Sequence, residues 1–565
     1  MDPRSSLQIY PRRDEKYKTK GSINFDLLRT RVFRGSPEPP RSLQMLFYCL
    51  IGIGTALTAV ILTVTENWLI KMKLSLLDEV IGGLQNNLYW TWLYYSAFSA
   101  AFAFLTAALV VYVCPEAAQS GTVELQAYLN GVNFSSWFSL RTYAVKAAAM
   151  ILTAMSGLMV GRAGTFAHFG AIIGMGSLYL PIRGVECFHV NTRKREFVAA
   201  GMACGMAVAF GAPVGGALFG FEISSPNTYW GFSSMWRTFL TCMVGVMTYS
   251  LFLTAWDGKW LLNSTPLRFT SNGFTEAPGY LIIPQALVIG FVCGLVSAAF
   301  ISLNTYANLF RKLQYRLNYQ KCIECVGVCL VTTTMQFWVP YWCNPVCFKQ
   351  PVVSTEQPMT YVQYNCPAGY YNPLASLLLN SESLVINAFL TDIQDFQTDL
   401  KLSTFYLSIF GLMWFYFSSM TYGSPVPTGV FLSAILIGSS IGYLSENLRL
   451  IIFAEQSASI STAPVLIGAA CMMSGYTKLT YSVILLMLEA TSSTSLVIPL
   501  VFAIVTTQQV TKRLTRTSLL DRELRQKQVP FLRGSCPKAT RGVKAYQIMN
   551  QKLVCLESIA SLGSI

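Results

Sequence analysis

The sequence predicts an all-α protein embedded in a membrane, and three observations support this fold class. Of its 565 residues, 53% are hydrophobic and only 12% are charged, whereas a soluble globular chain carries about 25% charged residues. The mean hydropathy is +0.44. Apolar stretches recur along most of the sequence, and several are long enough for a helix to cross the ~30 Å core of a bilayer. This pattern argues against a soluble enzyme. We expect no catalytic activity and no cofactor, because no catalytic triad or phosphate-binding loop is evident.

The chain has 41 Lys and Arg residues against 27 Asp and Glu residues, which gives a formal net charge of +14. In a membrane protein this excess is typical of basic residues gathered on the cytoplasmic side. A positive charge would also suit a pathway for anions, but the net value alone does not identify one. We expect contact with membrane lipid and no nucleic-acid partner.

The elements follow in order from the apolar stretches. Residues 1–45 are polar and basic, and we expect a cytoplasmic tail. The first two spanning segments are expected at 46–70 and 89–114, the second with an aromatic-rich start typical of the membrane interface. The remaining apolar stretches lie near 143–160, 164–180, 197–222, 236–255, 281–305, 322–342, 403–420, 426–445, 464–473 and 481–508.

Several of these stretches are shorter than the ~20 residues that a spanning helix needs. They are interrupted by Gly, Pro, Ser and Thr rather than by clusters of charge. Broken helices at membrane depth are tolerated where they are buried in protein or line a cavity. The interruptions therefore indicate a transport protein in which short helices meet at a central site.

A weak internal repeat supports this interpretation. The pattern Gly-x-Ala-Cys at Gly201 leads to Glu222, and the same pattern at Gly468 leads to Glu489. The matched positions are 267 residues apart (468 − 201 and 489 − 222). A duplicated fold with two halves, at about 46–255 and 281–510, has its site between them.

The polar stretch 343–402 is expected to be a lumenal or extracellular loop, because it contains Cys343, Cys347 and Cys366. A disulfide from Cys343 or Cys347 to Cys366 would form on an oxidising side of the membrane. The sequon at Asn263 is informative only if it lies on that same side. The pair Cys322 and Cys325 lies in an apolar segment, so we interpret both as buried side chains. With two histidines in the chain, we expect no metal cluster.

Three Gly-rich breaks are the candidate functional segments: Gln119-Ser-Gly-Thr-Val-Glu124, Gly161-Arg-Ala-Gly-Thr-Phe-Ala-His168 and Gly423-Ser-Pro-Val-Pro-Thr-Gly-Val-Phe-Leu-Ser433. Each places small residues where a helix is expected to start inside the membrane. The unpaired N–H groups and positive dipole of a helix N-terminus suit an anion that has lost its water. The Ser120 hydroxyl and the amides of Val430 and Phe431 are the candidate donors. Each break taken alone is also explained by close packing of small residues.

In this order, the segments resemble the CLC family of chloride channels and chloride/proton exchangers. The similarity covers about residues 40–532 and is greatest to the lysosomal and late-endosomal branch. It is carried by Ser120-Gly121, Gly161-Arg162-x-Gly164, Gly201 to Glu222, Pro427-Thr-Gly-Val-Phe431, Gly468 to Glu489, Lys194-Arg-Glu-Phe-Val198, Gly369-Tyr-Tyr-Asn-Pro373 and Val529-Pro-Phe-Leu532.

The resemblance implies a CLC-type inverted-repeat bundle of tilted and broken helices, at 46–532, with one anion pathway in each subunit of a homodimer. It implies an anion site at Ser120, Gly121, Arg162, Ala163, Gly164, Val430, Phe431 and Leu520. It also favours an intracellular membrane, such as that of a lysosome, endosome or vacuole. Branch members can pair with a β-subunit, but no residue of this sequence identifies one.

The sequence departs from the family pattern at the positions that handle protons. Ala163 replaces the gating glutamate, and Ile223 replaces the internal proton acceptor. Leu520 stands where the inner-gate tyrosine is expected. Desolvated carboxylates are the usual proton carriers in a membrane, so their loss predicts transport without proton coupling.

Two interpretations remain. The first is passive, proton-uncoupled conduction of chloride or other small anions. The second is a transport-inactive relative that serves as a structural or regulatory subunit of a larger membrane assembly. Further replacements near the site favour the second: Gln119 for Gly, Val123 for Pro and Ser433 for Pro. Residues 533–565 resemble the start of a CBS domain, most clearly at 545–557, and we expect them to be cytoplasmic.

Overall fold

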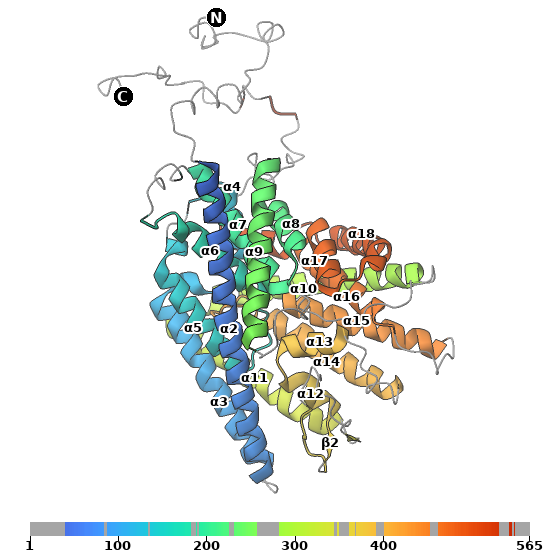
Figure 1. Cartoon of the computed structure of the whole chain (residues 1–565). Coiled ribbons are helices and arrows are strands. Elements are labelled where there is room, and N and C mark those ends of the chain that lie inside the picture. Colours follow the sequence, from blue (N-terminus) through green and yellow to red (C-terminus); the bar gives the residue numbers. More distant parts are fainter. Residues whose placement is uncertain are drawn as a thin grey trace, which may run out of the picture.

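The computed structural model describes residues 40–83, 88–133, 136–181, 188, 191–224, 231–256, 282–343, 347–349, 361–367, 369–390, 400–452, 461–529, 542–544 and 547. Within these residues the protein is helical apart from one short hairpin, and seven helical segments are long and apolar enough to cross a membrane. The predicted all-α membrane fold is therefore confirmed (Figure 1). The sequon at Asn263 and nearly all of the CBS-like segment lie outside the described residues.

The helices before residue 260 are α2 (Arg41–Gly83), α3 (Leu88–Ala108), α4 (Thr122–Asn130), α5 (Leu140–Ser156), α6 (Ala163–Ser177), α7 (Asn191–Phe210), α8 (Pro213–Ser224) and α9 (Phe232–Trp256). Helix α3 continues as a π-helix over Leu109–Val113, and short 3-10 turns lie at Pro115–Ala117 and Ser136–Phe138. Since Gly211 has a φ of 70° and Pro213 follows, the single apolar stretch predicted at 197–222 ends one helix and begins another.

The later helices are α10 (Ile282–Gln314), α11 (Asn318–Cys343), α12 (Pro373–Leu379), α13 (Glu382–Leu390), α14 (Leu400–Thr421), α15 (Phe431–Ile452), α16 (Ala463–Thr477), α17 (Tyr481–Thr491), α18 (Val497–Leu514) and α19 (Leu519–Gln526), with a 3-10 turn at Thr494–Leu496. Helix α19 begins with a capping box, in which Ser518 and Asp521 bond to each other's backbone amides. The short helices α16 and α17 are apolar but too short to cross a bilayer, as predicted for 464–473. The single stretch predicted at 481–508 is instead divided into α17, the 3-10 turn and α18.

The helices of the two halves pack in corresponding pairs. Helix α6 lies on α7 as α15 lies on α16, and α2 lies on α9 as α10 lies on α18. Glycine lets the helices of α6–α7 and of α15–α16 approach closely. A Cβ at Gly170 would overlap the carbonyl of Gly201, and a Cβ at Gly438 would overlap that of Gly468. These are the small-residue contacts by which membrane helices approach closely.

The polar stretch expected as a loop contains more regular structure than the sequence indicated. It includes α12 and α13, and α14 begins at Leu400. Between α11 and α12, strand β1 (Phe348–Lys349) pairs with β2 (Tyr370–Tyr371). A disulfide joins Cys347 to Cys366, which confirms one of the two predicted pairings and leaves Cys343 free. Asn372 caps α12 by accepting from the Ala375 amide at 3.0 Å.

The first segment is also longer than predicted. Helix α2 begins at Arg41 rather than near residue 46 and runs for 43 residues to Gly83. A helix of this length spans about 65 Å, more than twice the hydrocarbon thickness. In Figure 1, α2 runs from the end of the molecule near α4 to the end near β2.

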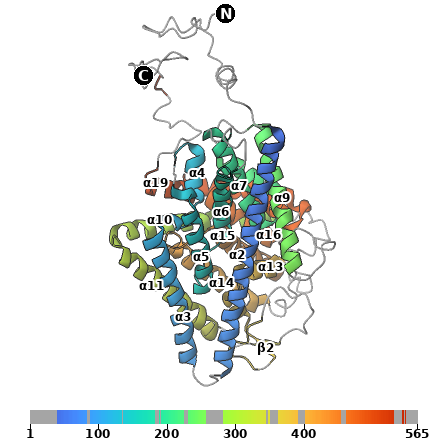
Figure 2. The same ribbon diagram turned by 60° about the vertical axis from the view of Figure 1, so that its left-hand side comes forward.

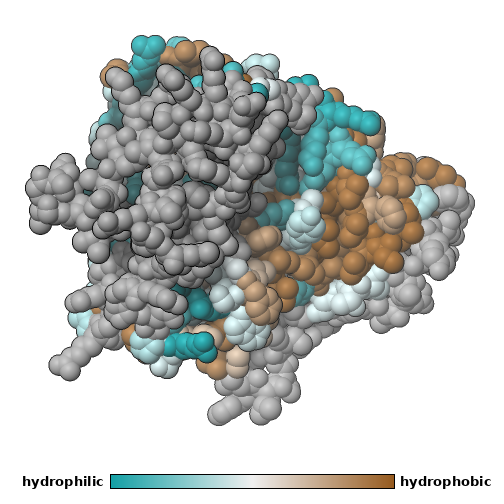
Figure 3. Space-filling model, turned by 90° about the horizontal axis from the view of Figure 1, so that it is seen from above, coloured by the Kyte–Doolittle hydropathy of each residue, from teal (hydrophilic) through white to brown (hydrophobic). Residues whose placement is uncertain are grey.

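We name the two ends of the molecule from these elements. The end with the β1–β2 hairpin is the outer end, since its disulfide indicates an oxidising compartment. The opposite end, where α4 and α19 lie close together in Figure 2, is the inner end. The view from the inner end shows apolar side chains in a broad band on one flank (Figure 3), as expected for a surface that faces lipid or another subunit.

Candidate functional site

The break before α4 is a sharp turn that buries Ser120. Gln119 and Gly121 both have left-handed backbones, with φ of 58° and 80°. Ser120 is 3% exposed. Its Oγ lies 2.6 Å from Thr122 Oγ1 and accepts a hydrogen bond from the Thr122 amide at 3.3 Å. Gly121 is required because an added Cβ would lie 2.5 Å from Nδ1 of His168.

The breaks before α6 and α15 are joined by backbone hydrogen bonds. The Gly161 amide donates to the Gly429 carbonyl at 3.0 Å, and the Gly429 amide donates to the Gly161 carbonyl at 2.6 Å. Helix α6 begins two residues after Gly161, at Ala163, and α15 begins two residues after Gly429, at Phe431. The two helices therefore start side by side.

The first break joins the other two. The Gln119 amide donates to the Val426 carbonyl at 2.9 Å. Gly164, in the first turn of α6, lies so close to α4 that an added Cβ would be 2.8 Å from the Ser120 Cβ. The structure thus brings the three predicted breaks together, with all their predicted site residues buried: Ser120, Gly121, Arg162, Ala163, Gly164, Val430 and Phe431. We call this meeting of three helix starts the helix junction.

The three substituted positions have apolar surroundings. Ala163, Ile223 and Leu520 are each 3% exposed. Ala163 and Ile223 belong to the main hydrophobic core. Leu520 packs with Leu524 of α19 and with Val123 and Ala127 of α4. The structure therefore places Leu520 one turn along α4 from Ser120, at the inner end.

A charged group ties α19 to α4 beside this apolar contact. Lys527 Nζ donates to Glu523 and to the Gln119 side chain, both at 2.7 Å, and forms a close ion pair with Glu124. The Tyr422 hydroxyl donates to Glu523 Oε2 at 2.7 Å. Gln119, Glu523 and Lys527 also line an inner cavity of about 410 Å³. The inner end is thus closed over α4 by both apolar and charged contacts.

A buried lysine of α5 contacts α6, the helix that begins at the junction. The Lys146 side chain, on α5, is fully buried, and its Nζ lies 2.7 Å from Nδ1 of His168 on α6. The two nitrogens share one hydrogen bond inside the protein. A lone lysine in the apolar stretch 143–160 is a signal for a buried pair, but its partner is not visible in the sequence.

Two glutamates join the halves of the fold. Glu222 accepts hydrogen bonds from the amides of Thr480 and Ser482 at 2.6 and 3.2 Å, at the start of α17. Glu489, on α17, accepts from the amides of Val214 and Gly215 at 2.9 and 3.0 Å, at the start of α8. Glu222 of α8 therefore caps the start of α17, and Glu489 of α17 caps the start of α8, as expected for structural residues.

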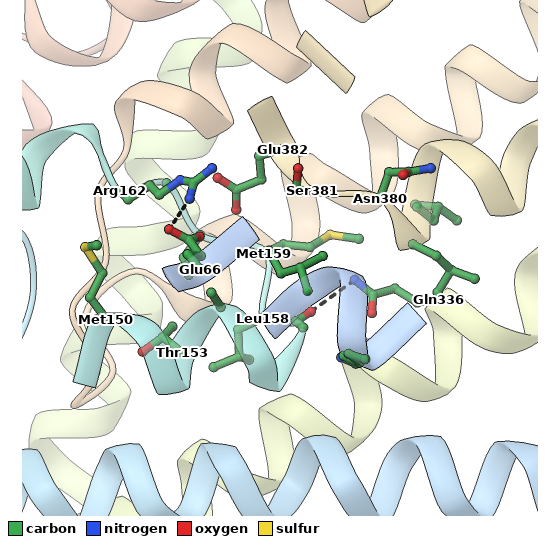
Figure 4. Close-up of a pocket in the computed structure, with 18 of the residues that line it drawn as sticks. Glu66, Met150, Thr153, Leu158, Met159, Arg162, Gln336, Asn380, Ser381 and Glu382 are labelled. Atoms are coloured by element: carbon green, nitrogen blue, oxygen red, sulfur yellow. Dashed lines mark hydrogen bonds and ion pairs between the residues drawn. The ribbon is translucent and has the colours of Figure 1, made fainter. Parts of the chain in front are cut away.

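Arg162 reaches a cavity of about 90 Å³ toward the outer end (Figure 4). Its guanidinium forms a close ion pair with Glu66 of α2 and donates to Ser383 Oγ at 3.0 Å. Glu382 of α13 points toward the same pair. The Arg162 and Glu66 side chains are 7% and 5% exposed. Sequence reasoning missed both glutamates, because Glu66 lies in an apolar helix and Glu382 comes from 316 residues later in the chain (382 − 66).

Comparisons with known proteins agree with this fold. The chain aligns with a solved structure of a eukaryotic CLC transporter at a TM-score of 0.64 and 19% identity, over 86% of this chain and 74% of that one. It aligns with a cyanobacterial Cl⁻/H⁺ antiporter at a TM-score of 0.67 and 15% identity, over 87% and 99%. The chain therefore shares the helical membrane fold of these two structures.

The sequence comparisons identify the family. The model of the voltage gated chloride channel family matches residues 102–512. The chain is 30% identical to H(+)/Cl(−) exchange transporter 7 of Bos taurus, over 91% of this chain and 64% of that protein. It is 26% identical to chloride channel protein C of Dictyostelium discoideum, over 99% and 75%. The chain therefore belongs to the voltage gated chloride channel (CLC) family, and it spans 64% of the length of the exchange transporter.

Proposed function

We propose that the protein conducts chloride or another small anion passively across a membrane, without coupling to protons. The observation that carries this proposal is the helix junction, in which three helix starts and the Ser120 hydroxyl meet inside the protein. Partial positive charges of this kind hold an anion loosely enough to release it again. Membership of the family supports chloride as the substrate.

The absence of coupling is proposed from two side chains. Ala163 and Ile223 carry neither charge nor a titratable proton, and both are buried in the core. Related proteins include H(+)/Cl(−) exchange transporters, so the proposal departs from those relatives at these two positions. His168 is a poor substitute for a proton carrier, because its ring is buried and shares a hydrogen bond with Lys146.

The second candidate is a transport-inactive subunit of a larger membrane assembly. The inner end favours it, since Leu520 packs on Val123 and Ala127 and Lys527 bridges α19 to α4. If these contacts stay closed, an anion at the junction has no exit on that side. This candidate differs from the first only in whether the inner end opens.

We further propose that the protein works as a homodimer in an intracellular membrane such as that of a lysosome, endosome or vacuole. The branch similarity of the sequence and the exchange transporter 7 relatives support this location. A β-subunit or other membrane partner also remains a proposal, supported by the branch similarity alone.

The test is chloride efflux from loaded liposomes that contain the purified protein, with the external pH recorded at the same time. Conduction predicts chloride release that needs a valinomycin shunt and moves no protons. Proton movement in fixed ratio to chloride would overturn the absence of coupling. Folded protein that gives no more flux than protein-free liposomes would establish the inactive candidate. Gly327→Val, on α11 outside the junction, where an added Cβ meets no atom within 4 Å, is the matched control for a junction variant, Gly164→Val.

A further inference from the structure

The outer cavity contains more charge around Arg162 than an anion entrance needs. Glu66 and Glu382 both line it, and Arg162 is the cation between them. Lys73, the other cation of this cavity, donates to neutral groups: its Nζ lies 2.9 Å from the Met155 carbonyl and 3.3 Å from Ser99 Oγ. With all four groups ionised, the two carboxylates and two cations leave the lining without net charge, and protonation of one carboxylate makes the lining net positive.

The two carboxylates differ in how they are satisfied. Glu66 pairs directly with the guanidinium. Glu382 has one oxygen, Oε2, that is shielded from solvent and accepts no hydrogen bond from the described residues. A buried carboxylate oxygen without a donor is costly when ionised, and a proton removes that cost. Glu382 is therefore the member of the group that gains most from protonation.

The other titratable groups around Arg162 have partners of their own: Glu66 pairs with the guanidinium and Lys73 donates to the Met155 carbonyl. Tyr249 of α9 also interacts electrostatically with the guanidinium. Among the described residues that line the cavity, α2 contributes Glu66 and Lys73, α3 contributes Tyr95, Arg162 precedes α6, and α13 contributes Glu382. Helices α5, α11, α12 and α14 contribute only side chains that do not titrate. The Tyr95 hydroxyl is committed to the Gln336 side chain at 3.2 Å.

We propose that Glu382 controls the entry of anions at the outer end through its charge beside the Glu66–Arg162 pair. When ionised, it completes a lining without net charge, and its own carboxylate repels an approaching anion. When protonated, it leaves the lining with a net positive charge, and anions reach the helix junction more readily. This inference rests on the proposed anion pathway and assigns a titratable carboxylate to its entrance, although the gating position itself is Ala163.

The test compares anion flux into liposomes at equal pH on both sides, from about pH 8 to about pH 5, a range that a shielded carboxylate can cross. The variants are Glu382→Gln, which fixes the neutral form, and Glu382→Asp, which keeps the carboxylate. Glu196→Gln is the control, since Glu196 pairs with Arg193 at 3.0 Å and Arg237 at 3.8 Å outside the cavity. The readout is the chloride concentration that gives half-maximal flux.

We expect the half-saturating concentration of the native protein to fall about three- to tenfold as the pH falls, the effect of one nearby charge in a partly polar medium. Glu382→Gln should show the low value at every pH, while Glu382→Asp and Glu196→Gln should keep the pH response. A Glu382→Gln protein with the native pH profile would overturn the inference.

A second variant covers the case in which Glu382→Gln does not fold. In Glu66→Gln, Glu382 becomes the carboxylate partner of Arg162, so the pH response should move to lower pH. An unchanged response would overturn the inference. A native protein whose flux does not depend on pH would refute the role of Glu382 while leaving the anion pathway intact. A native protein without flux would refute both.

Discussion

The two ends of the molecule each hold one cation between two carboxylates, but in different surroundings. At the outer end, Arg162 lies in a small cavity with Glu66 and Glu382, and its side chain is 7% exposed. At the inner end, Lys527 lies between Glu124 and Glu523, and its side chain is 32% exposed. The outer cation precedes a core helix, whereas the inner one follows a helix of eight residues, α19.

This difference determines what each group can do. A charge shielded from water acts strongly on its neighbours, so the outer group suits the control of ion entry. At the inner end the Glu124 and Glu523 side chains are 6% and 7% exposed, but 32% of the Lys527 side chain is exposed, so water screens its charge more than that of Arg162. The inner ion pairs and the apolar contact of Leu520 and Leu524 with α4 together hold α19 against α4.

The largest expected effect comes from removing each cation in turn. Arg162→Met leaves two shielded carboxylates without a partner, which costs about 3–5 kcal/mol of stability and lowers anion flux more than about tenfold by repulsion. Lys527→Met also leaves two buried carboxylates without a partner, but water reaches the place of the more exposed cation, so we expect a smaller cost of about 1–3 kcal/mol. Thermal unfolding in detergent and liposome flux measure both. Equal losses in the two variants would contradict the distinction between the ends.

Restoring a carboxylate beside the junction should have the next largest effect. In Ala163→Glu, an ionised side chain at the start of α6 competes with the anion, so we expect flux to fall about tenfold at neutral pH, equivalent to about 1.4 kcal/mol. Acidification should restore flux as the carboxylate gains a proton. Ala163→Gln, which has the same size without the charge, is the control. A loss of flux that persists in acid would show a steric effect instead.

Weakening the inner closure should raise flux by a smaller factor. Leu520→Ala removes the side chain that packs on Val123 and Ala127 of α4, at a cost of about 2–3 kcal/mol in the folded state. We expect a two- to threefold increase in flux, because α19 would leave α4 more often. Leu519→Ala, an equally buried neighbour in the main core, is the control. A decrease in flux for Leu520→Ala alone would mean that α19 supports the pathway.

The smallest effect on flux is expected from the outer hairpin. Cys347→Ser opens the disulfide to Cys366, whose loop spans 19 residues, and should lower stability by about 2–3 kcal/mol without changing flux. A reductant that cannot cross the membrane should act as the substitution does when added on the outer side. If reduction requires access from the inner side, the assignment of the two ends is wrong.

Much of the junction was predictable, because the determinants lie close together in the sequence. Glycine, proline and a hydroxyl at three short segments indicated where α4, α6 and α15 begin. The apolar stretches predicted the long helices, although the stretch 197–222 joined α7 and α8, which are separate helices on either side of Gly211. One of the two predicted disulfide pairings, Cys347 to Cys366, is present, and its cysteines are only 19 residues apart in the sequence.

The charged groups at the two ends were not predictable, because their members are far apart in the chain. Glu124 and Lys527 are separated by 403 residues, and Arg162 and Ser383 by 221. Each of these residues also has an ordinary local explanation, such as a helix-end charge. Composition and periodicity carry no information on which distant charge a side chain meets.

The exchange of caps between Glu222 and Glu489 also has a consequence for biosynthesis. The amide of Val214 receives its carboxylate from a residue 275 positions later. At about 5–20 residues per second, the ribosome reaches that residue tens of seconds afterwards. During this interval the first half sits in the bilayer with the start of α8 uncapped. The nascent chain must therefore be protected from misassembly until α17 emerges. A chain that terminates before residue 489 has no Glu489 carboxylate to cap α8.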